Sequence, residues 1–432
     1  MTIMPTTQRL PQGIGRLTPR WWLFVTATLA VLGFGLVAYS RQLSEGLIVT
    51  GLRDVGTMGG ATWGLYVAFD VYFVGVSFAG ITVAALIRLF NLEHLRPLAR
   101  MAELLTVVSL VLAGLTIMAD LGQPLRGFVN LFRYARPQSP FFGTFALVIA
   151  GYLFASLVYL YLSSRRDAAI MAGVPGPLQR LHRFVAAGYR DTPAQRERHK
   201  RTTFWLAIFI LPMLVLAHST LGFVFGLQIG RPGWYSALQA PAFVVLAGVS
   251  GIGMLIMLAA IVRRVLPDVT ALGDRVFAWL GRLLMVLVIV YLYFVGTELL
   301  TALYAGGEKE VGVTRALLSG EFAGIFWGSV ALLAVSLGLL IWQAIAKRWR
   351  TSWLVAIGVA VNVAAVGKRL LIAVPSQTHG TLLPYAPGSY VPTWVEYGII
   401  LGLFALGALI IAVFMKFIPI VELPEEVEVH AP

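Results

Sequence analysis

The stretch DLGQPLRGFVNLFRYARPQSPFFG, residues 120–143, separates two long apolar runs that carry no charge. The run before it ends at Asp120, and Gly122 and Pro124 follow as residues that stop a helix. The run after it begins at Phe141. Three arginines lie between the two runs: Arg126, Arg133 and Arg136. This order is typical of a polar loop at a membrane surface, so the flanking runs 103–120 and 141–164 are predicted to be membrane spans.

Apolar runs of this kind recur along the whole chain. Of the 432 residues, 58% are hydrophobic and only 12% are charged, and the mean hydropathy is +0.82. Such a composition excludes a soluble globular protein. Because about 20 apolar residues cross the hydrocarbon layer, we predict ten spans: 21–40, 63–87, 103–120, 141–164, 202–226, 240–262, 278–302, 321–346, 352–374 and 394–416. The expected fold is an all-α polytopic membrane protein.

The basic residues indicate how the chain is oriented. If the spans alternate in direction, most of the 33 Lys and Arg residues fall on the side that holds both termini, above all in 165–201. Positively charged loops stay in the cytoplasm, so we expect both termini to be cytoplasmic in a bacterial inner membrane and 120–143 to face outward. The net charge of +13 is then a property of membrane topology, and no nucleic-acid partner is expected.

The residue types that hold metal cofactors are scarce. The chain has no cysteine, which excludes Fe–S clusters of its own. A b-type haem held by two histidines needs both of them at matched depth in the membrane. Of the six histidines only His218 lies within a predicted span; the others are His94, His182, His199, His379 and His430. We therefore expect neither haem nor Fe–S in this chain.

Ionisable residues inside the spans gather in one half of the membrane. Five are predicted to lie in the outer half: Asp70, His218, Glu298, Lys368 and Arg369. Asp120 and Arg126 are expected at the rim of the same half. Trp63 and Tyr66 share a helical face with Asp70, which lies ~10 Å inside the membrane at 1.5 Å per residue. Ionisable groups within a membrane commonly mark a functional site.

A quinone is the ligand that suits these residues. Its reduction takes two electrons and two protons, and carboxylate and imidazole groups can exchange protons near neutral pH. Glu103, at the cytoplasmic edge, could begin a proton path. Structural interpretations remain open. His218 could join two helices by a hydrogen bond, Lys368 and Glu298 could form a structural ion pair, and Arg126 could brace its loop or bind lipid phosphate.

Three groups of residues form a combined motif: Trp63-Gly64 with Gly75 and Gly80, the string DLGQPLR at 120–126 followed by PQSP at 137–140, and His218 followed by Pro232-Gly233-Trp234. Together they resemble the NrfD/PsrC family, the membrane anchors of polysulfide-reductase-like complexes. The likeness covers spans two to nine. Ten spans resemble the longer branch of the family, as in alternative complex III, the sulfite-reduction-associated complex and hydrogenase-2-type anchors.

The resemblance implies an architecture. It predicts four-helix bundles at 63–226 and 227–374. Hydropathy and the distribution of charge predict a cytoplasmic tail at 1–20 and a first span and outer loop at 21–62. An outer loop and last span at 375–416 and a cytoplasmic tail at 417–432 complete the chain.

The resemblance also implies a function. It predicts a cofactor-free subunit of a respiratory quinone oxidoreductase, with menaquinone or ubiquinone near the outer face and an iron–sulfur ferredoxin-like subunit docked above it. Further catalytic or cytochrome subunits would complete the complex. Asp70 and His218 would flank the quinone headgroup, while Asp120 and Arg126 would shape the mouth of the site. Glu103, Glu298, Lys368 and Arg369 could conduct protons. A scaffold without quinone in the same kind of complex and a secondary transporter are the alternatives.

Overall fold

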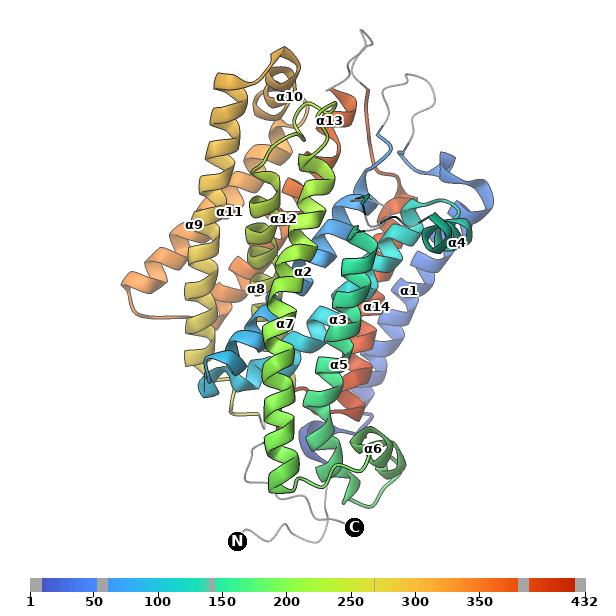
Figure 1. Ribbon diagram of the computed structural model, residues 1–432, viewed down its shortest axis with the longest axis vertical. Coiled ribbons are helices and arrows are strands. Elements are labelled where there is room, and N and C mark those ends of the chain that lie inside the picture. Colours follow the sequence, from blue (N-terminus) through green and yellow to red (C-terminus); the bar gives the residue numbers. More distant parts are fainter. Residues whose placement is uncertain are drawn as a thin grey trace.

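The structure is a computed structural model that describes residues 10–52, 61–134, 136, 138–139, 144–267, 269–379 and 388–423 (Figure 1). Ten helices within these ranges are long and apolar enough to cross a membrane. They are α1 Pro19–Glu45, α2 Leu65–Leu89, α3 Arg96–Asp120, α5 Thr144–Ala172, α7 Pro193–Gly226, α8 Gln239–Val265, α9 Asp274–Ala305, α11 Ala323–Ile345, α12 Thr351–Ala373 and α14 Trp394–Phe417. The all-α fold and its ten spans are confirmed; the predicted beginning at Phe141 lies outside the described residues.

Shorter helices occupy the connections. They are η1 Pro11–Gly13, η2 Leu47–Val49, η3 Glu93–Leu95, α4 Pro124–Tyr134, α6 Gln179–Ala186, α10 Glu308–Leu318 and α13 Pro375–Thr378. The prediction of a loop without helix at 120–143 is therefore wrong in part. Gly122 adopts a φ of +67° after α3, and Pro124 then begins α4, because a first helical residue needs no N–H donor. Pro137 and Pro140 lie outside the described residues.

The basic connection 165–201 is also more helical than expected. α5 continues to Ala172, α6 follows, and α7 begins at Pro193, well before its apolar part. The Thr192 side chain caps α7 by accepting a hydrogen bond from the Gln195 N–H at 3.3 Å. Since water as well as lipid permits a helix, an apolar run predicts only the part of a helix that crosses the hydrocarbon.

α2 lies at the centre of the bundle. It contacts α3, α7, α8 and α12, and most of its surface is buried (Figure 1). Gly80 permits the close approach to α3, since a side chain there would overlap the Ala102 carbonyl oxygen. Gly75 likewise leaves room for a side chain of α12. Most side chains of α2 are therefore enclosed by protein.

The other helices pack as one continuous set, with α1 and α14 as a flanking pair. α5 contacts α3 and α7, α8 contacts α7, α9 and α12, and α11 contacts α9 and α12. α1 packs along α14, where a Cβ on Gly35 would lie 2.7 Å from the Gly402 Cα. Because α2 also contacts α8 and α12, the grouping into two four-helix bundles stays a prediction. The predicted domain boundaries stay predictions.

The beginning of α1 and the end of α14 lie at the same end of the molecule. The Gly15 N–H donates to the Lys416 carbonyl at 3.1 Å, and the Gln12 amide donates to the Val421 carbonyl at 2.6 Å. An even number of spans requires this arrangement. Which side of the membrane holds this end stays a prediction, and residues 1–9 and 424–432 lie outside the described part.

Candidate functional site

Asp70 of α2 and Arg369 of α12 are buried together inside the bundle. Each side chain is only 3% exposed, and the two charges act on each other. Within the described part of the chain, Asp70 makes no hydrogen bond or ion pair, and the Nε and Nη2 of Arg369 have no hydrogen-bond partner. The guanidinium fits against α2 because residue 75 is glycine, whose absent Cβ would lie 3.1 Å from the Arg369 Cζ.

Aromatic and amide groups surround this pair. The Arg369 guanidinium lies 5.8 Å from the centre of the Phe243 ring. The Tyr72 hydroxyl donates to the Asn362 Oδ1 at 2.8 Å, and the Asn362 amide donates to the Gly358 carbonyl at 2.7 Å. Tyr72 and Asn362 are thus satisfied by each other, whereas the charged pair is not. A buried charge without hydrogen bonds is costly in a membrane, so such a pair indicates a site for a ligand or a proton.

Trp63 lies on the side of α2 toward α7. Its ring stacks on Trp234 with centres 5.5 Å apart and meets Phe225 edge-on at 5.7 Å. The Gln377 side chain holds the backbone here, accepting from the Trp63 N–H at 3.1 Å and donating to its carbonyl at 2.8 Å. The Trp234 indole N–H in turn donates to the Ile372 carbonyl at 2.6 Å. Trp63 is therefore a fixed aromatic wall at the beginning of α2.

Tyr66 faces the opposite direction from Trp63. Its hydroxyl donates to the Gln42 Oε1 at 2.5 Å, and the Gln42 amide donates to the Ala119 carbonyl at 2.6 Å. This chain of hydrogen bonds joins α2, α1 and α3 beside Asp120, whose charge acts on Tyr66. The predicted common face of Trp63, Tyr66 and Asp70 is therefore divided, because the three side chains meet different helices.

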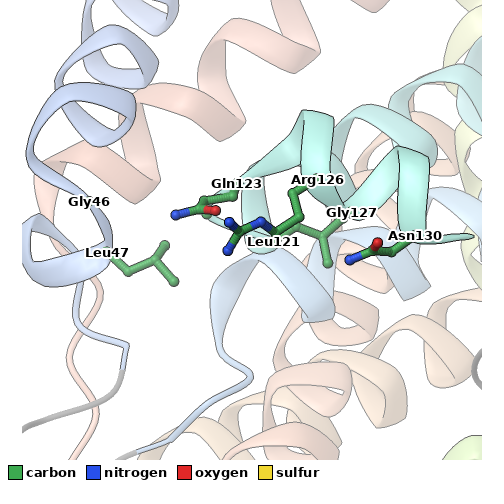
Figure 2. Close-up of a pocket in the computed structure, with 8 residues that line it drawn as sticks. Gly46, Leu47, Leu121, Gln123, Arg126, Gly127 and Asn130 are labelled. Atoms are coloured by element: carbon green, nitrogen blue, oxygen red, sulfur yellow. The ribbon is translucent and has the colours of Figure 1, made fainter.

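Arg126 lies on α4 and is exposed at the rim. It lines a surface pocket of about 410 Å³ between α4 and the end of α1, shown in Figure 2. The lining residues are Gly46, Leu47, Leu121, Gly122, Gln123, Arg126, Gly127 and Asn130. Asp120 ends α3 immediately before this pocket. The structure therefore places Asp120 and Arg126 near each other in the fold, and Asp70 deeper along α2.

His218 joins α7 to α2. One ring nitrogen lies 2.8 Å from the Leu214 carbonyl of its own helix, and the other lies 2.8 Å from the Val74 carbonyl of α2. The Phe78 ring covers it edge-on at 4.9 Å. Both nitrogens are thus directed at backbone acceptors. Among the described residues, neither a hydrogen bond nor an ion pair connects His218 to Asp70, although the two were predicted to flank one headgroup.

Lys368 and Arg369 are adjacent in sequence but diverge in the structure. The Lys368 ammonium lies 4.0 Å from Glu298 of α9 and 5.1 Å from the centre of the Phe326 ring of α11. Successive residues of a helix are turned by about 100°, so Lys368 faces α9 and α11 while Arg369 faces α2 and α8. The expected Glu298–Lys368 pair is present, at the edge of the bundle.

Glu103 belongs to a separate cluster at the end that holds the termini. It is fully buried, accepts a hydrogen bond from the Ser163 hydroxyl, and forms an ion pair with Arg88 at 3.2 Å. Arg88 also contacts Glu422 at 3.2 Å. Burial favours the protonated form of Glu422, but Arg88 and the neighbouring arginines hold its pKa below the ordinary value. Eighteen residues of α2 separate Asp70 from Arg88, or ~27 Å of helix.

A second buried pair supports this cluster. Arg100 is 1% exposed and lies 2.5 Å from Asp167 of α5. It also donates to the carbonyls of Ser163 at 2.5 Å and Pro419 at 2.9 Å. Reasoning from the sequence missed Arg100 and Asp167, as well as Gln42, Gln377 and Tyr72. A polar residue within or beside an apolar run was the available signal for each of them.

The described residues contain no group of three or more His, Asp or Glu side chains that could hold a metal ion. The chemistry available here is that of buried acids, bases and hydrogen-bond donors. The Asp70–Arg369 pair combines a carboxylate that can exchange a proton with donors that lack acceptors. Such a pair can bind an oxygen-bearing headgroup between helices.

The chain is similar to the proteins of one known family. The family model described as "Polysulphide reductase, NrfD" matches residues 54–379. A putative dimethyl sulfoxide reductase membrane subunit of Halobacterium salinarum is 30% identical, with 93% of this chain and 91% of the relative covered. The menaquinone reductase integral membrane subunit of Nitratidesulfovibrio vulgaris is 23% identical, with coverage of 97% and 96%.

A third relative bears on haem. The probable Ni/Fe-hydrogenase 2 b-type cytochrome subunit of Escherichia coli is 25% identical, with 90% of this chain and 92% of the relative covered. Its name refers to a cytochrome, so the expectation that this chain holds no haem stays a prediction. All three relatives are named as subunits of oxidoreductases. Together with a family match over most of the chain, they show that this protein belongs to the polysulphide reductase NrfD family.

Proposed function

We propose that this chain is the quinone-reactive membrane subunit of a respiratory oxidoreductase complex in a bacterial cytoplasmic membrane. It exchanges electrons between menaquinone or ubiquinone and an iron–sulfur subunit on the outer face. Two observations support the proposal. A relative is named as a menaquinone reductase subunit, and the buried Arg369, whose charge acts on the buried Asp70, has two donor nitrogens without acceptors.

The hydrogen-bond donors of Arg369 that have no acceptor suit a quinone. Quinone oxygens accept hydrogen bonds, and the Nε and Nη2 of Arg369 are donors without acceptors. A bound quinone supplies the two-electron, two-proton chemistry that this chain has no group to perform. In this assignment Arg369 orients a quinone oxygen, and Asp70 gives or takes a proton beside it. Trp63 closes the α7 side of the outer end of α2, and Tyr66 closes the α1 side.

His218 has a more limited role in this proposal than the sequence alone indicated. Its Nε2 holds α7 against the Val74 carbonyl, one helical turn from Asp70, while its Nδ1 is directed at the Leu214 carbonyl of α7. It therefore positions the segment of α2 that carries Asp70. Asp120 and Arg126 form the rim at α4, where the iron–sulfur subunit would dock above the quinone.

The alternative is a scaffold or proton conduit without quinone. The Glu103 cluster favours a proton role, because it holds a buried carboxylate beside the termini. The relatives give no support to the third interpretation, a secondary transporter, since all three are named as oxidoreductase subunits.

The test compares neighbouring cations on α12 in the purified complex. Arg369→Gln and Asp70→Asn should each abolish binding of a fluorescent quinone analogue and reduce quinol turnover. Lys368→Gln is the matched control, since Lys368 faces α9 and α11, and it should retain binding. Equal binding in all three variants would refute the assignment. A reduced-minus-oxidised spectrum of the separated chain tests for haem independently.

A further inference from the structure

A second pocket lies at the end of the molecule that holds the termini. It encloses about 450 Å³ between the end of α2, the beginning of α3 and the beginning of α7. Four cations line it: Arg88, Arg96, Lys200 and Arg201. Three carboxylates also line it: Glu93, Glu197 and Glu422. The quinone site does not include this pocket, because Asp70 lies ~27 Å along α2 from Arg88.

Two of the four cations, Arg88 and Arg96, have carboxylate partners. Glu422 is held by Arg88 and Arg96, each at 3.2 Å. Glu93 and Glu197 are exposed. Within the described residues, the Lys200 and Arg201 side chains make no ion pair, and the buried Arg88 Nε has no hydrogen-bond partner. The pocket therefore presents the Lys200 and Arg201 side chains to an anion.

An apolar surface continues from the pocket toward the membrane interior. Phe204 lines the pocket and is 42% exposed. Trp205 and Phe209 follow on α7, 50% and 63% exposed, with their ring centres 6.4 Å apart. Aromatic residues of this kind mark the boundary between headgroups and acyl chains. A cationic pocket directly beside such a boundary matches the two parts of a phospholipid.

We propose that this pocket binds the phosphate headgroup of an anionic phospholipid, whose acyl chain follows the aromatic surface of α7. Lys200 and Arg201 contact the phosphate, and Arg88 forms the inner wall. Basic pockets between helices on the cytoplasmic side are suited to such headgroups. The bound lipid would cover the seam between α2 and α7 at the level of Glu422.

The experiment uses the whole complex in nanodiscs that contain phosphatidylglycerol, followed by native mass spectrometry. The wild type should retain one tightly bound phosphatidylglycerol, and Lys200→Ala/Arg201→Ala should lose it at least several-fold. Arg180→Ala/Arg198→Ala is the matched control, because it removes two exposed charges of the same connection outside the pocket. This control should retain the lipid.

Two further arms make the result decisive. Lys200→Arg/Arg201→Lys keeps both charges and should retain the lipid, which separates loss of charge from loss of folding. Excess inorganic phosphate should leave the lipid bound; displacement by phosphate alone would show a free-anion site and overturn the proposal. Equal lipid retention by the pocket variant and the wild type would also overturn it, as would a polypeptide found in the pocket instead.

Discussion

The fit of Arg369 against α2 depends on a glycine, which makes Gly75→Ala a sensitive perturbation. The added methyl group would overlap the Arg369 Nη2 and would lie 3.1 Å from its Cζ and 3.3 Å from the Ser250 Oγ. Within the described part of the chain, no hydrogen bond anchors the Nε or Nη2 of Arg369. The guanidinium should therefore move away from α2 and from Asp70 while the helices stay in place.

The effects of this substitution on stability and on turnover can be estimated separately. Overpacking typically costs about 1–3 kcal/mol, of which the better helix propensity of alanine returns up to about 1 kcal/mol. The loss of stability should therefore be small. A hydrogen bond to a charged group contributes about 1.5–3 kcal/mol, and 1.4 kcal/mol corresponds to a tenfold change in rate. If Arg369 orients the quinone, turnover should fall about 10- to 100-fold.

The assay is quinol-dependent electron transfer by the purified complex, measured beside its thermal unfolding. Gly296→Ala is the matched control, because a Cβ at Gly296 of α9 would meet no atom within 4 Å. The control should keep wild-type turnover and lose no stability. Normal turnover in a folded Gly75→Ala complex would refute the reasoning, and so would an equal loss in the control.

Two further predictions concern the end of the molecule that holds the termini. Arg100→Ala leaves Asp167 buried without its partner and should lower the free energy of unfolding by about 3–5 kcal/mol. Thermal unfolding in detergent measures this loss. Arg264→Ala, at an exposed position, is the control and should change the stability little. The ion pairs of Glu422 hold its pKa below the ordinary value of 4.5. These ion pairs therefore stabilise the fold above pH 4.5. Their contribution disappears as the pH falls through the lower pKa of the folded state. Protease cleavage near residue 423 should therefore increase on acidification in the wild type but be insensitive to pH in Glu422→Gln; the same acid dependence in both would contradict this account.

The spans could be predicted because the thickness of the hydrocarbon layer imposes a length on every apolar run. The ends of the helices could not. α5 and α7 continue into water through polar residues that favour helix equally well, and Pro124 was interpreted as the end of one helix although it begins another. Hydropathy carries no information about helix beyond the membrane.

The candidate site was predicted as a set of residues but not as pairs. Asp70 and Arg369 were both selected because ionisable groups are rare in spans, yet Arg369 was grouped with Lys368 and Glu298. The direction of each side chain depends on how α12 is rotated against α2, and adjacent residues of one helix face different neighbours. Gln42 and Gln377 were missed because one amide in or beside an apolar run is too common to signal a contact.

The polar groups between the two charged clusters constrain how protons could move. Along α2 from Asp70 toward Arg88, the Val74 carbonyl faces His218, and the Ser77 carbonyl accepts from Thr106 at 3.0 Å and Tyr152 at 2.9 Å. These side chains use their hydrogen bonds on the backbone of α2, so they hold the helices together in the structure as it stands. A proton path from Glu103 to Asp70 would require these bonds to exchange for water. The proposed quinone reaction beside Asp70 and Arg369 would need no such rearrangement, so substitutions at Tyr152 and Thr106 that leave Asp70 and Arg369 intact would separate the two proposed activities.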